Sequence, residues 1–134
     1  MMEGFVLLPV LSGSSFMSVT SNGINFNGNV VFHMQKAKYI RLFLNSETNQ
    51  VAMQKCTEKD EGAIKFCRNE SKWKNGVRIN NRELQQKISN IMDWNLKEYN
   101  YRIIGFFSDK DNTLIFELNN ARKFRKRNRK KTTT

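Results

Sequence analysis

The chain has 134 residues and a formal net charge of +11, with 23 Lys and Arg against 12 Asp and Glu. Hydrophobic residues make up 39% of the sequence, which is typical of one globular domain with a modest core. One His and two Cys give too few ligands for a zinc site, and there is no nucleophilic triad and no glycine-rich phosphate loop. We therefore expect a binding protein rather than an enzyme, without catalytic residues, metal or cofactor.

The first 22 residues are expected to form an extended N-terminal segment. Residues 5–11 are an apolar run, but they follow an acidic start and precede no small-residue cleavage site, so they do not fit a secretion signal. They are also too short to span a bilayer. We interpret them as a strand that is buried or covered by a partner, followed by a flexible joint at residues 12–15. We expect the protein in the cytoplasm, with no membrane partner.

Residues 23–56 are expected to form a first structural unit. Residues 23–29 indicate a short strand that ends in Asn and Gly, and residues 30–36 indicate a short helix. Residues 39–44 alternate and are rich in strand formers, and residues 51–55 return after a loop of turn-forming residues. The order is strand, helix and hairpin.

Residues 77–118 are expected to repeat that order after a polar connector. The pattern predicts a short strand at 77–79, a helix at 82–92, a long strand at 99–107 and its return strand at 113–118. The two units share this plan although their residues barely match, so we interpret them as a pseudo-repeat.

The helix expected at 82–92 has an apolar face. Leu84, Ile88 and Ile91 lie at helical spacing, and we expect all three to be buried. Asn81 is the expected N-cap, because its side chain can accept a hydrogen bond from the first turn. The polar residues that we expect to point away from the core are Glu83, Gln85, Gln86 and Lys87.

Together these elements predict an α+β fold. It would hold two strand-helix-hairpin units with antiparallel sheet, the sheet of each unit being covered by its own helix. A single domain would span residues 23–120, with the pseudo-repeat at 23–56 and 77–118. A disordered basic C-terminal tail would follow at residues 121–134.

Eight short segments carry a resemblance to known proteins: Ile24–Asn27, Lys38–Asn45, Val51–Cys56, Glu58–Ile64, Met92–Trp94, Tyr101–Arg102, Gly105 and Leu114–Leu118. They resemble a family of small uncharacterised proteins carried by phages and integrative elements of low-GC Gram-positive bacteria. The similarity covers roughly residues 22–120 and implies a mobile-element origin but names no activity. The first unit more loosely resembles the AbrB-type swapped-hairpin regulators, which bind DNA as dimers. That resemblance leaves open both a homodimer and an internal pairing of the two units.

The tail at residues 121–134 is the strongest candidate site. It contains eight Arg and Lys and no acidic residue, whereas residues 1–120 carry 15 basic and 12 acidic side chains. Such a run repels itself and can release counterions from a polyphosphate, although it would also serve as a solubilising tail. The residues assigned to nucleic-acid binding here are Arg122, Lys123, Arg125, Lys126, Arg127, Arg129, Lys130 and Lys131.

Basic residues beside aromatic ones form weaker candidates. Lys72, Trp73 and Lys74 place an indole between two ammonium groups in a polar connector, which suits nucleic-acid binding, although Trp73 would also serve as a loop anchor. Two strands also combine aromatic and basic side chains, and core packing explains them equally well. These residues are Tyr39, Arg41, Phe43, Tyr99, Tyr101 and Arg102.

The remaining polar residues predict no chemistry. Cys56 and Cys67 admit a disulfide, but we expect structural thiols because disulfides are rare in a reducing cytosol. His33 adjoins Met34 on an expected short helix, so we interpret it as a structural or surface residue.

The sequence therefore favours a non-enzymatic protein of a phage or mobile element that binds DNA or structured RNA by phosphate contacts through its basic tail. The alternative is a phage-encoded inhibitor of a host defence system, of the anti-CRISPR type, which binds stoichiometrically to an effector protein or ribonucleoprotein. The small size and the lack of catalytic motifs suit either function.

Overall fold

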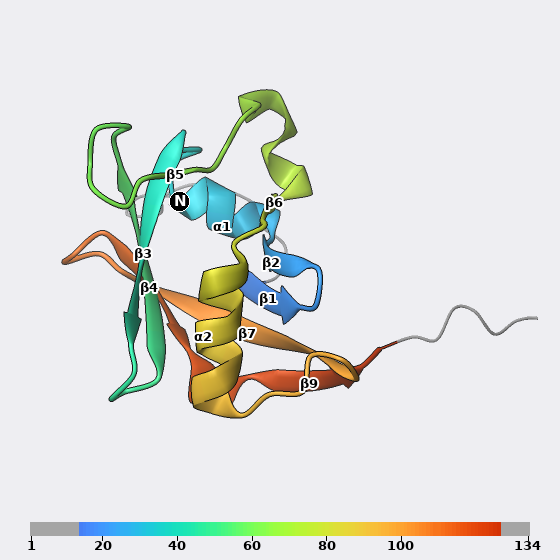
Figure 1. Ribbon diagram of the computed structural model, residues 1–134. Coiled ribbons are helices and arrows are strands. Elements are labelled where there is room, and N and C mark those ends of the chain that lie inside the picture. The colour runs from blue at the N-terminus through green and yellow to red at the C-terminus, as the bar shows by residue number, and fades with distance from the viewer. Residues whose placement is uncertain (1–13, 127–134) are drawn as a thin grey trace, which may run out of the picture.

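The computed structural model describes residues 14–126. Within them, strands hold 42% and helices 23% of the residues, so the architecture is that of a curled antiparallel β-sheet with few helices (Figure 1). The helices are α1 (Gly28–His33), α2 (Arg82–Met92) and two 3-10 helices, η1 (Glu70–Asn75) and η2 (Leu118–Asn120). The nine strands are β1 (Phe16–Thr20), β2 (Gly23–Phe26), β3 (Tyr39–Asn45), β4 (Gln50–Cys56), β5 (Ile64–Lys65), β6 (Val77–Ile79), β7 (Tyr99–Ser108), β8 (Thr113–Glu117) and β9 (Arg122–Arg125).

The sheet is built on three hairpins, β1–β2, β3–β4 and β7–β8. Its strand order is β5-β3-β4-β8-β7-β1-β2-β6, and β9 pairs with β7 outside this path. Strand β7 is the longest and has β1 along one edge. Along its other edge, β8 pairs with residues 105–108 and β9 with residues 99–102. The strands β8 and β9 are therefore joined end to end beside β7, with η2 between them.

The core lies on the inner face of the sheet, against the helices. Met17 and Val19 of β1 and Ile103 of β7 point inward and are fully buried, as expected for alternate residues of a strand. Val31 of α1 and Ile88 of α2 are buried in the same cluster. Figure 1 shows α2 lying across this side of the sheet.

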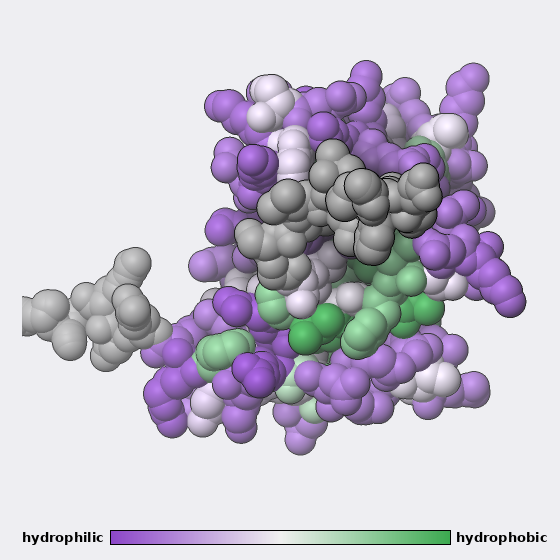
Figure 2. All heavy atoms as spheres, turned by 180° about the vertical axis from the view of Figure 1, so that it is seen from behind, coloured by the Kyte–Doolittle hydropathy of each residue, from purple (hydrophilic) through white to green (hydrophobic). Residues whose placement is uncertain are grey.

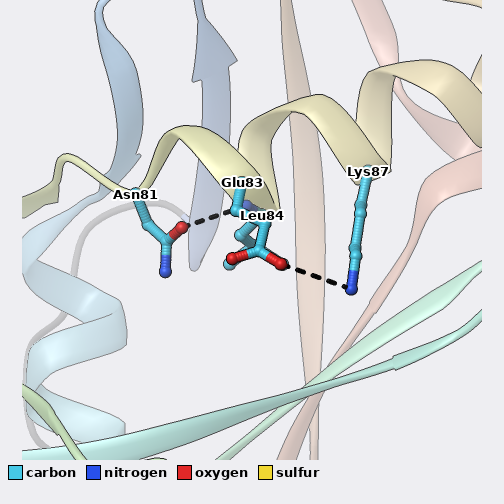
Figure 3. A network of polar contacts seen from close by, with 4 residues as sticks. All are labelled: Asn81, Glu83, Leu84 and Lys87. Carbon is cyan, nitrogen blue, oxygen red and sulfur yellow. Dashed lines mark hydrogen bonds and ion pairs between the residues drawn. The ribbon is translucent and has the colours of Figure 1, made fainter.

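Helix α2 begins and ends where its capping residues place it. The side chain of Asn81 accepts a hydrogen bond from the Leu84 N–H at 3.0 Å, and the Lys87 ammonium lies 3.9 Å from Glu83 on the exposed side (Figure 3). Asp93 ends the helix in a left-handed conformation. The predicted helix at 82–92 and its N-cap are confirmed.

The predicted buried face of α2 is correct for some residues and wrong for others. Ile88 is fully buried and Leu84 is half-buried, but Ile91 is 37% exposed. Gln85, expected to point to solvent, is buried and donates a hydrogen bond from its amide to the Thr20 carbonyl at the end of β1. The buried stripe is therefore rotated toward β1, and a polar residue lies inside it. Gln86 is exposed as expected.

The predicted arrangement of the elements is wrong. The order of strand, helix and hairpin exists in both halves, but the two hairpins do not form separate covered sheets. Val51 of β4 pairs with Phe116 of β8, so the β3–β4 and β7–β8 hairpins merge into one sheet. Helix α1 has only six residues and packs mainly on η1.

The prediction of a fully disordered basic tail is also wrong. Residues 122–125 form β9, which continues the sheet beside the first half of β7. The main-chain pairing satisfies backbone groups of both strands, and the Tyr99 ring of β7 lies under Lys123 and Arg125 of β9. Strand β1 was not expected in the sheet either. Residues 1–22 were interpreted as an extended segment with a joint at residues 12–15, and the domain was expected to begin at residue 23.

Candidate nucleic-acid interface

The middle of strand β7, residues 103–107, is apolar on both of its faces. Tyr101 and Ile103 point inward and are buried, whereas Ile104 and Phe106 point outward and are 41% and 58% exposed. A strand that covers a core on one face ordinarily carries polar residues on the other. Contiguous exposed apolar groups at the centre of a sheet indicate a binding surface. We call this side of the sheet the outer face.

Five residues directly opposite one another form a row across the outer face. Arg122 of β9 pairs with Arg102 of β7, which pairs with Ser18 of β1. The row continues to Asn25 of β2 and Arg78 of β6. It crosses four strand spacings, or about 19 Å. We call it the arginine row, because three of its members are exposed arginines.

Arg102 is held between two aromatic rings. Its guanidinium carbon lies 5.1 Å from the centre of the Phe16 ring and 4.9 Å from that of the Phe124 ring. Both distances fit cation–π contacts, which are worth about 0.5–1 kcal/mol each at exposed sites. The rings hold the guanidinium group in place and leave its donors for a ligand.

The other end of the arginine row borders two hollows. Arg78 donates from Nε to the Asn25 side chain at 3.1 Å. A hollow of about 500 Å³ extends from Arg78 to Arg102 over Ser18 and Asn25. A second hollow, of about 270 Å³, lies next to it, since residues 75–78 line both. Lys72 and Arg68 lie in the wall of the second hollow and continue the positive charge.

An apolar row crosses the other half of the outer face. Phe106 of β7 pairs with Ile115 of β8, which pairs with Ala52 of β4, and Ala52 pairs with Phe43 of β3. Phe43 is 47% exposed. Ile104 lies between this apolar row and the arginine row on β7. Figure 2 shows hydrophobic residues gathered in the lower middle of this face, with hydrophilic residues below them and at both ends.

The predicted tail site is divided by the structure. Arg122 belongs to the arginine row, while Lys123 and Arg125 lie over the Tyr99 ring at 4.5 and 5.2 Å on the other side of β9. The Lys126 ammonium donates to the Ser21 hydroxyl at 2.6 Å. The remaining predicted residues, Arg127, Arg129, Lys130 and Lys131, lie outside the described residues.

The predicted residues of the connector lie on η1. Trp73 is half-buried and its ring lies 5.4 Å from that of Phe32 in α1, so it anchors η1 to α1. The ammonium groups of Lys36 and Lys74 lie over the same indole at 5.5 and 5.7 Å. Lys72 is exposed and lines the second hollow. The charges of this connector are therefore available to a ligand, whereas its tryptophan is engaged in packing.

The strand at 39–44 also carries its aromatic and basic residues on the outer face. The Arg41 guanidinium lies 5.4 Å from the centre of the Phe43 ring, and Arg41 Nε has no hydrogen-bond partner among the described residues. In the adjoining loop, the Thr57 N–H bonds to the carboxylate of Asp60 and lowers its pKa. Burial raises the pKa of the Cys56 thiol, and Asp60 adds to that effect. Cys56 therefore stays protonated at neutral pH and is a poor nucleophile.

The arginines of the arginine row form no ion pair within the described part of the chain. Across residues 14–126, the one ion pair is Lys87 with Glu83 on α2. Arg78, Arg102 and Arg122 therefore have no acidic group of these residues within 4.0 Å. Cations that lie near one another without acidic partners produce a positive potential that a polyanion can neutralise.

Within the described part of the chain, no helix has both the length and the apolar character to cross a membrane. The two cysteines are free thiols, Cys67 buried and Cys56 half-buried.

No family model, curated protein or solved structure matches the chain. The resemblances to mobile-element proteins and to swapped-hairpin regulators stay predictions.

Sequence reasoning named Arg102 only as a weaker candidate, and it did not name Arg78 or Phe16. A signal for Arg102 was present, because it precedes Ile104 and Phe106 at alternate positions of a strand whose intervening residues are also apolar. Arg78 and Phe16 carried no comparable signal, since their place in the row depends on which strands pair and in which register.

Proposed function

We propose that the protein is a non-enzymatic nucleic-acid-binding protein of the cytoplasm. It contacts phosphates with the arginine row and with the basic residues of β9, and the positive charges that follow β9 strengthen the attraction. The observation that supports this most directly is the arginine row itself, which borders a hollow of about 500 Å³ and whose three arginines are exposed and have no ion-pair partner among residues 14–126.

Arginine suits this role because its planar group donates several hydrogen bonds to phosphate oxygens at once. Ser18 and Asn25 add a hydroxyl and an amide between the arginines, and such groups are common phosphate ligands. Lys72 and Arg68 extend the positive surface beyond Arg78. Binding of this kind is largely independent of base sequence and weakens as salt rises.

Protection of a sheet edge is another role for basic residues. Charged side chains on an edge strand prevent pairing with other chains, and β9 is such a strand. That explanation does not extend to Arg102, which lies on β7 with strands on both sides. Edge protection therefore does not account for Arg102, whereas phosphate binding accounts for all three arginines of the row.

The test compares two double variants of equal charge. Arg78→Gln with Arg102→Gln removes two members of the row, and Lys59→Gln with Lys110→Gln removes two cations from exposed loops. Lys110 lies about 20 Å from Arg102 along the direction of β7. Binding of labelled 20-mer single strands and duplexes is followed by fluorescence anisotropy between 50 and 300 mM salt.

We expect the row variant to lose at least about tenfold in affinity at moderate salt. Its slope of log K against log salt falls by about 0.7–0.9 for each lost phosphate contact. The loop variant keeps most of its affinity, because its charges act only at long range. Equal losses in the two folded variants, as judged by circular dichroism, contradict the site.

A second candidate is a stoichiometric inhibitor that docks on an effector protein or ribonucleoprotein. The apolar row favours it, because Phe43 and Phe106 are exposed and protein interfaces are enriched in such aromatic anchors. This function predicts that free nucleic acid does not bind at any salt concentration, whereas a purified effector complex does. The anisotropy series above separates the two.

A further inference from the structure

We infer that the nucleic acid bound at this site is single-stranded, with its phosphates along the arginine row and its bases stacked on the aromatic and apolar side chains of the outer face. This inference rests on the proposed function and specifies its ligand.

Aromatic rings are exposed beside the arginines of the arginine row. Phe124 is 41% exposed and Phe106 is 58% exposed, while Phe16 is half-buried against Arg102. A duplex presents phosphates and groove edges, and its base faces are covered by their neighbours. A single strand presents the base faces, which stack on aromatic side chains and arginine planes.

Strand β7 carries a regular series of outward side chains. Arg102, Ile104 and Phe106 are successive outward positions, about 7 Å apart along the strand. Ile104 pairs with Phe16, so these two residues lie side by side between the arginines and the apolar row. A nucleic-acid strand whose backbone follows the arginine row can therefore turn bases toward Ile104 and Phe106 on one side of the row, and toward Phe124 of β9 on the other.

The side-chain oxygen of Asn100 is a hydrogen-bond acceptor for which the described residues supply no donor. Asn100 of β7 pairs with Phe124 of β9, and its side-chain oxygen is buried with no hydrogen-bond partner among the described residues. A base that stacks at Phe124 carries exocyclic amino and ring N–H groups that can reach such an acceptor after a small side-chain movement. Buried polar atoms ordinarily have partners, so this one points to a ligand.

Positive charge lies beside the exposed rings. Stacking alone is weak in water, but Arg78, Arg102 and Arg122, which form no ion pair with the described residues, lie within reach of the same ligand. The combination of a basic track and stacking rings is how proteins hold single strands with little sequence preference. A duplex would leave the apolar row facing phosphates, which stabilises neither partner.

The experiment compares a 20-nucleotide dT strand, a 20-nucleotide rU strand and a 20-base-pair duplex with the full-length protein at one salt concentration. We expect the single strands to bind at least about tenfold more tightly than the duplex. Phe124→Ala and Phe106→Ala each lower single-strand affinity by about fivefold or more, and duplex affinity stays within about twofold.

A matched control and a rescue variant keep the result specific. Ile91 is a large exposed apolar residue on α2, away from the outer face, and Ile91→Ala is expected to leave both affinities unchanged. Phe124→Trp keeps a ring for stacking and is expected to bind single strands at least as tightly as the wild type. Phe124→Leu keeps the apolar bulk that β9 needs but removes the ring, and it is expected to lose affinity.

Three other outcomes would each overturn the inference. Duplex binding as tight as single-strand binding, with a steep salt slope, overturns the inference and leaves the proposed function standing. Equal losses of duplex and single-strand affinity in the phenylalanine variants show that the rings support the fold or Arg102 without stacking on bases, which also overturns it. No binding of any of the three ligands overturns the proposed function and the inference together.

Discussion

Ile88 fixes α2 on the sheet. Its side chain is fully buried in the main cluster, so Ile88→Ala removes packing that the surroundings cannot restore. We expect a loss of about 2–4 kcal/mol in the free energy of unfolding. Gln86 is exposed two residues earlier on the same helix, and Gln86→Ala is expected to change it by less than about 0.5 kcal/mol. Urea denaturation of both variants measures the difference, and similar losses would show that α2 packs through another face.

Gln85 and Ile91, which lie three residues before and after Ile88 on α2, were predicted wrongly. The helical spacing of Leu84, Ile88 and Ile91 correctly located the buried face. Its edges were wrong, because Gln85 is buried and Ile91 is exposed. Burial of Gln85 depends on the Thr20 carbonyl, which lies on a strand 65 residues away in the chain. A single sequence does not reveal such a partner.

At the scale of elements, Gly76 determines how η1 passes into β6. Its φ is +76°, and a Cβ atom there would collide with the Phe26 carbonyl oxygen. Gly62 also has a positive φ, +81°, but a Cβ atom there would have no neighbour within 4 Å. Gly62→Ala is therefore the control, with an expected cost of about 1–2 kcal/mol from backbone strain alone.

Gly76→Ala is expected to cost clearly more stability than Gly62→Ala in urea denaturation, because backbone must also move. It should lower nucleic-acid affinity too, since residues 75–78 border both hollows and Arg78 follows directly. Gly62→Ala should leave affinity unchanged. Equal costs at the two glycines would mean that the segment at 75–78 is not packed against β2 as described.

The elements differ in how far their sequences revealed them. The β3–β4 and β7–β8 hairpins and α2 were predictable, because alternation, turn residues and an N-cap are local signals. β9 was not, because its four residues, Arg122–Arg125, predict repulsion and no burial. It forms because β7 offers a free edge and Tyr99 offers a ring beneath two of the cations. Neither feature is visible in the tail sequence.

The same reasoning applies to the candidate site. Sequence composition directed attention to Arg122 and its basic neighbours, and their role in binding stays a prediction. The arginine row itself could not be predicted, because it joins Arg78, Arg102 and Arg122 through strand pairings distant in the chain. A shift of one residue in any of these registers would turn an arginine toward the core.

At the scale of the whole molecule, charge and fold overlap at the C-terminus. Eight basic residues lie at 121–134, and three of them, Arg122, Lys123 and Arg125, belong to β9. Deletion of residues 127–134 removes Arg127, Arg129, Lys130 and Lys131 and leaves β9 in place. We expect the thermal midpoint to stay within about 2 °C of the full-length value, while the salt slope falls by up to about 3.6 on duplex DNA.

Deletion of residues 121–134 is expected to behave differently in both measurements. It also removes β9, leaves the edge of β7 at residues 99–102 unpaired, and takes away Arg122 and Phe124. The midpoint should fall by at least about 4 °C, since a loss of even 1 kcal/mol has about that effect on a domain of this size. Single-strand affinity should fall beyond the loss caused by the shorter deletion, because a stacking ring and a row arginine are lost with the charge. Scanning calorimetry and anisotropy on the three proteins test this, and a midpoint equal to that of the full chain would show that β9 contributes nothing to the stability of the sheet.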